Sequence, residues 1–343
     1  MKLLVTGGAG FVGSAFVRSL MNAPAPDEVI VLDKLTYAGR AINIRNGGNG
    51  QKVVLVVGDV LDTELVYHLL SDVQVVVHFA AESHNTRSET DPDLFYRTNV
   101  GGTRSVMDAC QKYQKDFPHG PFQVVHVSTD EVYGPAQPGV FFKEEDFGQP
   151  GNQPTSPYSK SKFEADAAVR TTYADLKPVV IRPTNNFGPY QNPEKALPRW
   201  ICAALQNRPL KVWGTGQQVR DWLYTGDTVR AIKALLHDHQ AGPFNIGANH
   251  LPEITNLEIA QKVLYILGKP RSLIDMVGDP RPDHDFRYGV DTGKLLSGGY
   301  FAGWPGKFEQ QLEETVRWYS DHDWWWKPLI AEAEALYKDK EKS

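Results

Sequence analysis

The sequence predicts an α/β protein in which a doubly wound parallel sheet is joined to a smaller, mixed α/β domain. Two observations lead to this fold class. In the first half of the chain, short runs of β-branched and aliphatic residues alternate with longer segments that have a helical spacing of apolar residues. After Arg182 this alternation gives way to proline-rich and polar stretches. The change indicates a second domain that is less regular than the first.

The predicted strands of the first half are short and mostly apolar, as strands buried on both faces are. They are Leu3–Thr6, Glu28–Leu32, Lys52–Val57, Gln74–Phe79, Gln123–Ser128 and Pro178–Arg182. The predicted helices between them are Gly10–Met21, Leu61–Leu70, Asp93–Tyr113 and Pro157–Ala174. The Gly- and Asn-rich stretch Tyr37–Gln51 is expected to be an insertion loop.

The second half predicts fewer and more widely spaced elements. Strands are expected at Leu210–Trp213 and Phe244–Gly247, and helices at Asp227–His237, Leu257–Leu267 and Phe308–Ser320. We expect the chain to return once to the first domain. The first domain would then comprise residues 1–182 and 221–248, and the second would comprise residues 183–220 and 249–343.

Composition and charge argue against several functional classes. The 343 residues are 41% hydrophobic and 22% charged with a net charge of −5, so we expect no surface for nucleic acid. No apolar stretch is long enough to cross a bilayer, and the first residues lack the pattern of a secretory leader. Cys110 and Cys202 stand apart in predicted helical stretches, which makes neither a metal site nor a disulfide framework. We therefore expect a cytoplasmic protein that holds no metal.

A glycine-rich turn joins the first predicted strand to the first predicted helix. Within Thr6–Gly13, the residues Gly7, Gly10 and Gly13 have the spacing that lets a backbone approach a pyrophosphate at a helix N-terminus. Asp33 closes the second strand, where a carboxylate binds the ribose hydroxyls of adenosine and repels a 2′-phosphate. The sequence therefore predicts a Rossmann-type domain that binds NAD in preference to NADP.

Three residues near Asp33 have alternative interpretations. Lys34 and Arg40 carry positive charges that would weaken the repulsion of a 2′-phosphate. Asp59 follows the third predicted strand, where it can hydrogen-bond the adenine edge or cap the next helix. The sequence alone does not choose between these two roles of Asp59.

Tyr158 and Lys162 lie one helical turn apart in the predicted helix Pro157–Ala174. A cation beside a phenol stabilises the phenolate, so Tyr158 could act as a base near neutral pH. The same spacing is common on exposed helix faces. Here it accompanies the glycine-rich turn and Ser128-Thr129, which follow the fifth predicted strand and can bind a substrate hydroxyl.

Asp130 and Glu131 come directly after Thr129, at the carboxyl end of a predicted buried strand. Two buried carboxyl groups are costly unless they are paired or used. Different surroundings can separate their pKa values, so that one donates a proton and the other accepts one. An acid pair in an ordinary turn is the alternative. An elimination reaction requires such a pair, whereas a simple reversible dehydrogenation does not.

Together these residues resemble the extended short-chain dehydrogenases/reductases and, among them, the nucleotide-sugar 4,6-dehydratases. The resemblance runs essentially from end to end. Besides the turn Thr6–Gly13 and the Tyr158/Lys162 pair, it is carried by Asp33–Gly39, His78–His84, Thr98–Val100, Ser128–Gly134, Asn185–Tyr190, Pro193–Lys195, Arg220–Tyr224 and Trp324–Trp326.

The resemblance implies three sets of site residues. The catalytic set is Thr129, Asp130, Glu131, Tyr158 and Lys162. The cofactor set is Gly7, Gly10, Phe11, Val12, Gly13, Asp33, Lys34, Leu35, Thr36, Asp59, Val60, Ala80, Ala81, Ser83, Thr98, Tyr158, Lys162 and Asn186. The nucleotide-sugar set is His84, Thr129, Asn185, Lys195, Lys211, Val212, Trp213, Arg220, Asn256, Arg281 and His284.

Arg220 also has a physical argument of its own. It follows Gly214 and Gly216, and a guanidinium on such a loop can grip a diphosphate through two parallel hydrogen bonds. The alternative is a surface arginine paired with Asp221.

The sequence departs from the family pattern on the nucleotide-sugar side. Thr86 stands where an Asp is usual, Lys211 replaces a Pro, and Trp213 replaces the Tyr expected against the pyrimidine. Pro280 and Asp283 interrupt the usual Asp-Arg-Pro-Gly-His run, and two extra residues precede Asn256. The reaction type is therefore predicted more firmly than the sugar or the base.

The implied activity is the NAD-dependent dehydration of an NDP-hexose, with dTDP-glucose as the expected substrate, to an NDP-4-keto-6-deoxyhexose. Tyr158 would serve C4 oxidation, and Glu131 and Asp130 would serve removal of water across C5 and C6. The alternatives are a UDP-sugar dehydratase, a 4-epimerase or a decarboxylase of the same fold. A non-catalytic NAD-binding module is a more remote one, because such proteins characteristically lose the Tyr or the Lys.

The resemblance also implies a two-fold homodimer built on a four-helix bundle from the helices near Asn99–Tyr113 and Pro157–Ala174. Apolar or small residues lie at helical spacing on both segments. They are Val106, Met107, Cys110, Phe163, Ala167 and Ala168. Packing inside one protomer would explain the same residues.

Overall fold

The computed structural model describes residues 1–21, 28–44, 52–118, 122–279, 285–299 and 303–338. The chain divides into two compact units. Unit 1 comprises Met1–Val132, Ser156–Pro183 and Thr228–Ile246, and unit 2 comprises Tyr133–Thr155, Thr184–Asp227 and Gly247–Ser343. The chain thus enters unit 1 again at Ser156 and at Thr228.

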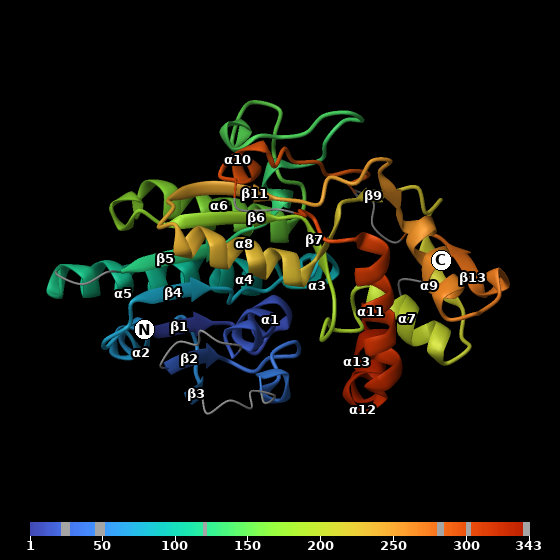
Figure 1. Ribbon diagram of the computed structural model, residues 1–343, viewed down its shortest axis with the longest axis horizontal. Coiled ribbons are helices and arrows are strands. Elements are labelled where there is room, and N and C mark those ends of the chain that lie inside the picture. Colours follow the sequence, from blue (N-terminus) through green and yellow to red (C-terminus); the bar gives the residue numbers. More distant parts are fainter. Residues whose placement is uncertain (22–27, 45–51, 119–121, 280–284, 300–302, 339–343) are drawn as a thin grey trace. The chain divides into compact units, whose positions relative to one another are not determined.

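Unit 1 is built on a seven-stranded sheet whose strand order is β11-β6-β5-β4-β1-β2-β3 (Figure 1). All neighbouring strands in it are parallel. The strands are β1 Lys2–Thr6, β2 Glu28–Asp33, β3 Lys52–Val57, β4 Val75–His78, β5 Gln123–Val127, β6 Val179–Pro183 and β11 Gly242–Ile246. The order reverses between β1 and β4, and ligands of such sheets bind beyond the carboxyl ends of the strands at this switch point.

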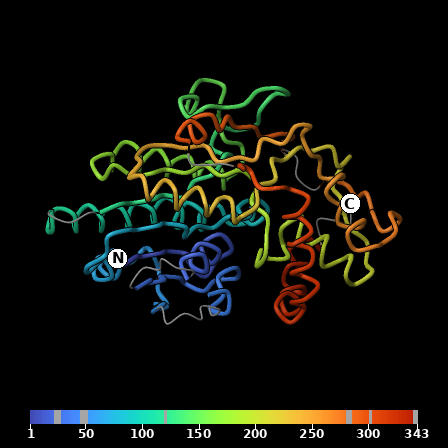
Figure 2. Tube along the Cα trace, viewed as in Figure 1, coloured from blue at the N-terminus to red at the C-terminus, as the bar shows by residue number. Residues whose placement is uncertain are grey.

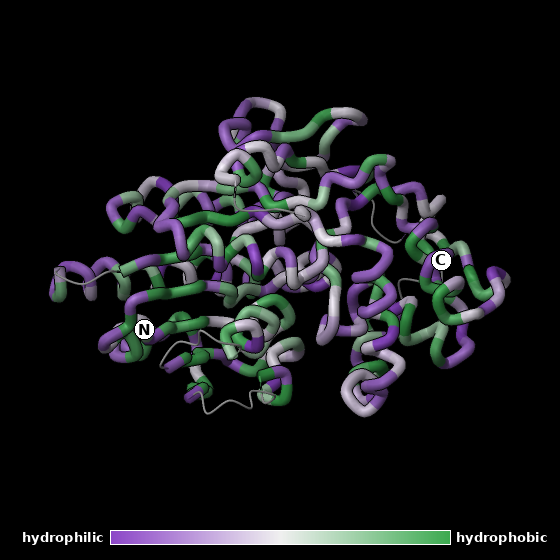
Figure 3. The backbone as a smooth tube through the Cα atoms, in the orientation of Figure 1, coloured by the Kyte–Doolittle hydropathy of each residue, from purple (hydrophilic) through white to green (hydrophobic). Residues whose placement is uncertain are grey.

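Helices cover both faces of this sheet, which confirms the predicted doubly wound fold. Helices α2 (Thr63–Leu69), α5 (Gly102–Asp116) and α6 (Pro157–Thr171) pack against one another on one face. Helices α1 (Phe11–Leu20) and α8 (Thr225–His237) are joined by a hydrogen bond of 3.4 Å from Lys233 Nζ to the Ser19 carbonyl. Figure 3 shows that the strands between these helices are mostly hydrophobic.

The core of unit 1 explains the apolar patterns of its strands and helices. Side chains from the strands pack against those of α2, α5 and α6 in one cluster. Its members include Leu4, Leu32, Val76, Val124, Val180, Val66, Val106, Met107, Cys110 and Val169. Val106, Met107 and Cys110 have no exposed surface, so in this structure they serve the core of one protomer.

Two predicted segments differ from the observed structure. The predicted helix Asp93–Tyr113 is interrupted: α4 (Pro92–Phe95) is followed by a π-helical turn, η2 (Tyr96–Gly101), before α5 begins. The predicted loop Tyr37–Gln51 contains a 3₁₀ helix, η1 (Ala41–Ile44), because Asn43 Nδ2 donates to the Ala9 carbonyl and anchors it. Residues 45–51 of that loop lie outside the described residues.

Unit 2 contains three two-stranded sheets and several helices, and the path of its chain can be followed in Figure 2. Strand β7 (Asn185–Phe187) pairs with β10 (Trp222–Tyr224), β8 (Leu210–Trp213) with β13 (Ile274–Val277), and β9 (Val219–Arg220) with β12 (Ile254–Thr255). The helices are α7 Ala196–Leu205, α9 Asn256–Ile266, α10 Gly293–Ser297, α11 Phe308–Asp321, α12 Asp323–Trp326 and α13 Ile330–Ala335.

The core of unit 2 is aromatic. Trp325 and Trp326 of the Trp324–Trp326 run are buried, and Trp326 Nε1 donates to the Tyr319 carbonyl at 2.7 Å. The Trp325 ring lies edge-on to Tyr190, with 5.5 Å between ring centroids. Among the described residues of both units, no helix combines the length and the apolar character that a membrane span needs.

Candidate active site

The predicted catalytic residues of unit 1 gather at the carboxyl end of β5. Thr129, Asp130 and Glu131 are buried, and the last two begin the 3₁₀ turn η3 (Asp130–Tyr133). Thr129 Oγ1 donates to Asp130 Oδ1 at 3.2 Å and accepts from the backbone N–H of Glu131 at 3.3 Å. The Thr129 hydroxyl therefore fixes the Asp130 carboxyl group and the backbone of Glu131.

Helix α6 brings Tyr158 and Lys162 to the same place. The helix begins where it does because Ser156 caps it through a reciprocal hydrogen-bond pair with Ser159, and Pro157 occupies its first position. Lys162 Nζ donates to the Val127 carbonyl at 2.8 Å, which ties α6 to the last residue of β5. Both site residues of α6 are buried.

The electrostatics of this pair differ from the sequence-based expectation. Burial raises the pKa of the Tyr158 phenol, the negative charges of Glu131 and Asp130 raise it further, and a hydrogen bond with Thr129 lowers it. Burial lowers the pKa of Lys162 to about 8, against the opposing effect of Asp166. The protein alone therefore does not lower the pKa of Tyr158; a positive charge brought by a ligand would do so.

Two asparagines that sequence reasoning missed connect the elements of this site. Asn99, in the π-helical turn η2, bonds the Glu82 backbone through both its amide atoms and donates to Ser161 Oγ on α6 at 2.9 Å. Asn85, the first residue of α3 (Asn85–Thr90), lies between Ser156 and Glu131. π-Helical turns concentrate at functional sites, so η2 would have pointed to Asn99. Such a turn has no clear sequence signature, so the sequence did not predict it.

The glycine-rich turn between β1 and α1 has the shape that a pyrophosphate needs. Gly7 adopts a φ of +66°, and a Cβ on it would lie 2.5 Å from the Ala80 nitrogen. A Cβ on Gly13 would lie 2.3 Å from the Gly7 carbonyl oxygen. Because the residue that caps α1 is Gly10, no side chain covers the first N–H groups of that helix. The turn therefore fits a dinucleotide cofactor.

The carboxylate predicted to bind ribose lies beside this turn. Asp33 Oδ2 accepts from the Ala9 N–H at 2.9 Å and Oδ1 accepts from the Leu35 N–H at 2.8 Å. Burial raises the pKa of Asp33, and these two hydrogen bonds lower it. Lys34 Nζ pairs with Asp59 at 2.7 Å, so its charge is directed to Asp59. Lys34 therefore does little to weaken the repulsion between Asp33 and a 2′-phosphate, which favours NAD over NADP.

Asp59 does not cap the following helix, which removes one of its two predicted roles. Asp62 caps α2 and accepts from the Leu65 N–H at 2.9 Å. Asp59 Oδ1 instead accepts from the Leu61 N–H. Burial raises the pKa of Asp59, but the hydrogen bond and charge of Lys34 outweigh it, so the pKa is lowered. The adenine role of Asp59 stays a prediction.

The other predicted cofactor residues of unit 1 follow the carboxyl ends of its strands or lie in η2. Phe11 and Val12 start α1, Leu35 and Thr36 follow β2, Val60 follows β3, Ala80, Ala81 and Ser83 follow β4, and Thr98 lies in η2. Asn186 lies in β7 of unit 2, where its Nδ2 donates to the Thr184 carbonyl at 3.0 Å.

The predicted nucleotide-sugar residues are divided between the two units. His84 and Thr129 belong to unit 1. In unit 2, Asn185 lies in β7, Lys195 caps α7, Lys211, Val212 and Trp213 lie in β8, Arg220 lies in β9, and Asn256 begins α9. Asn185 Oδ1 is buried without a hydrogen-bond partner among the described residues, which is typical of a group that binds a ligand. Arg281 and His284, with Pro280 and Asp283, lie outside the described residues.

Arg220 is buried, so it is not the surface arginine of the alternative interpretation. Its guanidinium donates to the carbonyls of Val219, Asp285 and Phe286 at 2.7, 2.8 and 3.1 Å. Asp221 instead accepts from the Ala248 N–H at 2.8 Å. Arg220 therefore orders the chain that follows residue 284, in addition to any role toward a diphosphate.

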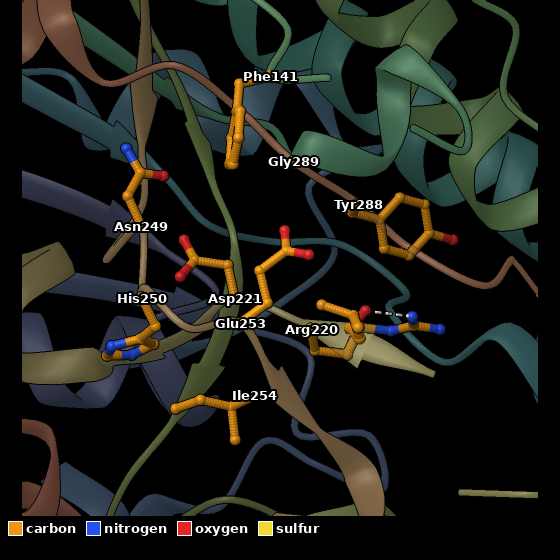
Figure 4. Close-up of a pocket in the computed structure, with 10 residues that line it drawn as sticks. Phe141, Arg220, Asp221, Asn249, His250, Glu253, Ile254, Tyr288 and Gly289 are labelled. Atoms are coloured by element: carbon orange, nitrogen blue, oxygen red, sulfur yellow. Dashed lines mark hydrogen bonds between the residues drawn. The ribbon is translucent and has the colours of Figure 1, made fainter. Parts of the chain in front are cut away.

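Arg220 also lines a small pocket in unit 2 (Figure 4). The other lining residues are Phe141, Val219, Asp221, Asn249, His250, Glu253, Ile254, Tyr288 and Gly289. Figure 4 shows the Asp221 and Glu253 carboxyl groups on one side and the Arg220 guanidinium toward Tyr288, whose ring centroid lies 4.8 Å from Arg220 Cζ. A diphosphate would meet these two acids here, so we do not assign the pocket to that group.

Comparisons with known proteins agree with this geometry. A dTDP-glucose 4,6-dehydratase of Streptomyces niveus is 38% identical over 98% of this chain and 97% of its own length. The crystal structure of DesIV, a dTDP-glucose 4,6-dehydratase of Streptomyces venezuelae with NAD bound, has a TM-score of 0.85 at 39% identity and covers 96% of this chain and 100% of DesIV. A UDP-glucose 4-epimerase of Thermus thermophilus in complex with NAD has a TM-score of 0.80 at 28% identity, covering 94% and 100% of the two chains.

The family model that matches this chain spans residues 3–247, which include the glycine-rich turn, the β5 terminus and helix α6. The chain belongs to the NAD dependent epimerase/dehydratase family.

Proposed function

We propose that this protein is an NAD-dependent hydro-lyase that converts dTDP-glucose to the dTDP-4-keto-6-deoxyhexose. The observation that carries this proposal is the buried pair Asp130 and Glu131 beside Tyr158, because an epimerase needs no such pair. The likeness to dTDP-glucose 4,6-dehydratases at 38% and 39% identity over nearly the whole chain supports the same reaction and the same nucleotide.

NAD, when bound, takes up a hydride from C4 of the sugar and returns it to C6 after water has left. The glycine-rich turn and Asp33 would hold its pyrophosphate and ribose. Tyr158 accepts the proton of the C4 hydroxyl. Lys162, fixed to the end of β5, supplies the positive charge that stabilises the Tyr158 phenolate before it takes up this proton.

The elimination is assigned to the two acids. The C4 ketone acidifies the proton on C5, which Glu131 removes as the C5–C6 double bond forms. Asp130 donates a proton to the C6 hydroxyl, which leaves as water. Glu131 gives its proton back to C5 when the hydride returns to C6. Thr129, hydrogen-bonded to Asp130 and to the Glu131 backbone, keeps the two groups on one short turn. Each positioned acid or base of this kind contributes about 10²–10⁴-fold to a rate.

Separate incubation with dTDP-glucose and UDP-glucose tests the reaction and the base together. The expected result is an alkali-induced absorbance of a 4-keto sugar with dTDP-glucose, and much less with UDP-glucose. Product from UDP-glucose alone would overturn the choice of thymine. Turnover to the C4 epimer without a 4-keto product would overturn the elimination.

We further infer that the protein acts as a cytoplasmic homodimer. Cys110 and Cys202 are both buried free thiols, which suits a reducing compartment. Of the predicted interface residues, Val106, Met107 and Cys110 are buried in the core of unit 1, whereas Phe163 and Ala167 are half-buried on α6. We therefore place the interface on α6. A monomer mass in light scattering at micromolar concentration would contradict the dimer.

A further inference from the structure

A short chain of hydrogen bonds leads from the start of helix α6 to Glu131 and passes through Asn85. Ser156 Oγ donates to Asn85 Oδ1 at 3.2 Å, and Asn85 Nδ2 donates to Glu131 Oε2 at 3.2 Å. Ser156 Oγ in turn accepts from the Ser159 N–H at 3.0 Å. All four residues belong to unit 1, and Glu131 is 8% exposed.

The partners fix the direction of this chain. If the Asn85 amide were turned over, its oxygen would face a carboxylate oxygen, and two acceptors would repel each other. With Nδ2 toward Glu131, the amide oxygen faces Ser156, whose hydroxyl has a proton to give. In this orientation each donor meets an acceptor, and the Asn85 N–H is accepted more strongly by an ionised Glu131 than by a protonated one.

The neighbours of Glu131 make this donor important. Asp130 precedes it in the chain, and Tyr158 lies close enough for the charge of Glu131 to act on its phenol. An ionised Asp130 or a Tyr158 phenolate would each oppose a negative charge on Glu131. The Asn85 N–H is a neutral donor that stabilises the negative charge of Glu131 against these neighbours. It does not itself give a proton to the reaction.

We propose that Asn85 is a positioning residue that holds the Glu131 carboxylate ionised and oriented for removal of the C5 proton. This inference rests on the proposed dehydratase function. Asn85 touches no reacting atom. It acts through Glu131 and couples this residue to the N-terminus of the helix that carries Tyr158.

The substitution Asn85→Asp tests this role with almost no change of shape. The aspartate still accepts from Ser156, but it places an oxygen where the nitrogen faced Glu131. Glu131 must then turn away or take up a proton, and either change slows removal of the C5 proton. We expect turnover of dTDP-glucose to fall by about 10-fold to 10²-fold, which is part of the contribution of one general base.

The diagnostic readout separates the two halves of the reaction. In a single turnover of the NAD-loaded enzyme, C4 oxidation should remain within about twofold of wild type, so the near-ultraviolet absorbance of the reduced cofactor accumulates. The isotope effect of deuterium at C5 of the substrate should increase, because cleavage of that bond now limits turnover. A residue with a merely structural role would slow both halves together.

A matched control lies on the same helix. Thr90 is exposed at the end of α3 and its Oγ1 donates to the Thr86 carbonyl at 3.3 Å. Thr90→Val removes a hydrogen bond of α3 but leaves Glu131 untouched, and both half-reactions should be unchanged. Asn85→Ala provides a second variant in case Asn85→Asp does not fold, and it should also accumulate the reduced cofactor.

Two outcomes would overturn the role of Asn85 while the proposed function survives. One is wild-type turnover by both Asn85→Asp and Asn85→Ala. The other is an equal loss of oxidation and elimination in both variants. If the wild-type enzyme itself gives no 4-keto sugar, the proposed function fails, and the role of Asn85 fails with it.

Discussion

The end of β5 in unit 1 and the loops of unit 2 organise their predicted site residues in different ways. Around β5, the predicted catalytic side chains come from two adjacent elements, are buried, and bond to one another or to the neighbouring backbone. In unit 2, the predicted nucleotide-sugar residues that the structure describes lie in or next to five separate elements, from β7 to α9. Among them, Arg220 has a physical argument for binding a diphosphate, but its guanidinium donates three hydrogen bonds to backbone carbonyls.

This difference indicates which property each region controls. A preorganised, buried cluster determines which bonds are made and broken, because its geometry does not depend on the substrate. Residues spread over separate loops determine how well a particular nucleotide sugar binds. The departures from the family pattern at Lys211 and Trp213 fall in this second region. Changes in unit 1 should therefore lower kcat, and changes in unit 2 should raise KM.

The largest effect should come from Tyr158→Phe, which removes the base for the C4 hydroxyl and keeps the ring that packs against Phe95. Without that base no hydride leaves C4, so we expect a loss of about 10²–10⁴-fold in kcat and no absorbance of reduced cofactor after mixing. Tyr67→Phe is the matched control, since its hydroxyl bonds Asp116 on the surface. If Tyr158→Phe oxidised C4 at nearly the wild-type rate, Tyr158 would not be the base for the C4 hydroxyl.

The pH dependence of C4 oxidation should reflect the unusual order of the two pKa values. Tyr158 has a raised pKa and Lys162 has a pKa of about 8, and the active pair needs an ionised phenol beside a charged ammonium. Below about pH 8 the phenolate fraction grows while Lys162 stays charged, so the rate should rise. Above it, loss of the ammonium offsets the gain in phenolate, so the rate should level off.

Lys162→Arg sharpens this test because a guanidinium keeps its charge throughout the range. In this variant the rise of the single-turnover rate should continue above about pH 8. A wild-type rate that falls steadily between about pH 6 and 8 would contradict the order of the two pKa values. An unchanged plateau in Lys162→Arg would show that Lys162 does not cause it.

The smallest effect should come from Trp213→Ala in unit 2. Trp213 ends β8, and its ring lies edge-on to Tyr337 with 5.4 Å between centroids. Loss of one aromatic contact with a base costs about 1 kcal/mol, so KM for dTDP-glucose should rise about fivefold with little change in kcat. A change confined to kcat would contradict the assignment of substrate binding to unit 2, because it would place Trp213 in the chemical steps.

Sequence patterns predicted the region around β5 well for physical reasons. Short apolar strands, the glycine-rich turn and the apolar spacing of the helix that starts at Pro157 are local signals, and the structure has a strand, a turn and a helix at these places. The boundaries of Lys52–Val57 and Leu210–Trp213 agree residue by residue. Asp130 and Glu131 were also predicted to lie at the end of β5, because they follow this strand directly in the sequence and only the strand had to be identified.

What sequence could not predict depends on contacts between distant residues. Asn85 acquires its role from Ser156 and Glu131, which are 71 and 46 positions away. The π-turn η2 interrupts a segment whose apolar spacing is helical throughout, and its residue Asn99 bonds Glu82 and Ser161, which are distant in sequence. Similarly, the raised pKa of Tyr158 arises from burial and from acids on another element, which outweigh its spacing to Lys162.

We propose that unit 1 holds two separable chemical centres, one for oxidation and one for elimination, and the substitution Asp130→Asn tests this separation. The asparagine still accepts from Thr129 but cannot protonate the departing C6 oxygen. After mixing the NAD-loaded variant with dTDP-glucose, the absorbance of reduced cofactor should rise and persist, while release of 4-keto product slows by about 10²–10⁴-fold. Dehydration by Asp130→Asn at the wild-type rate would contradict the account and reduce Asp130 to a structural turn residue.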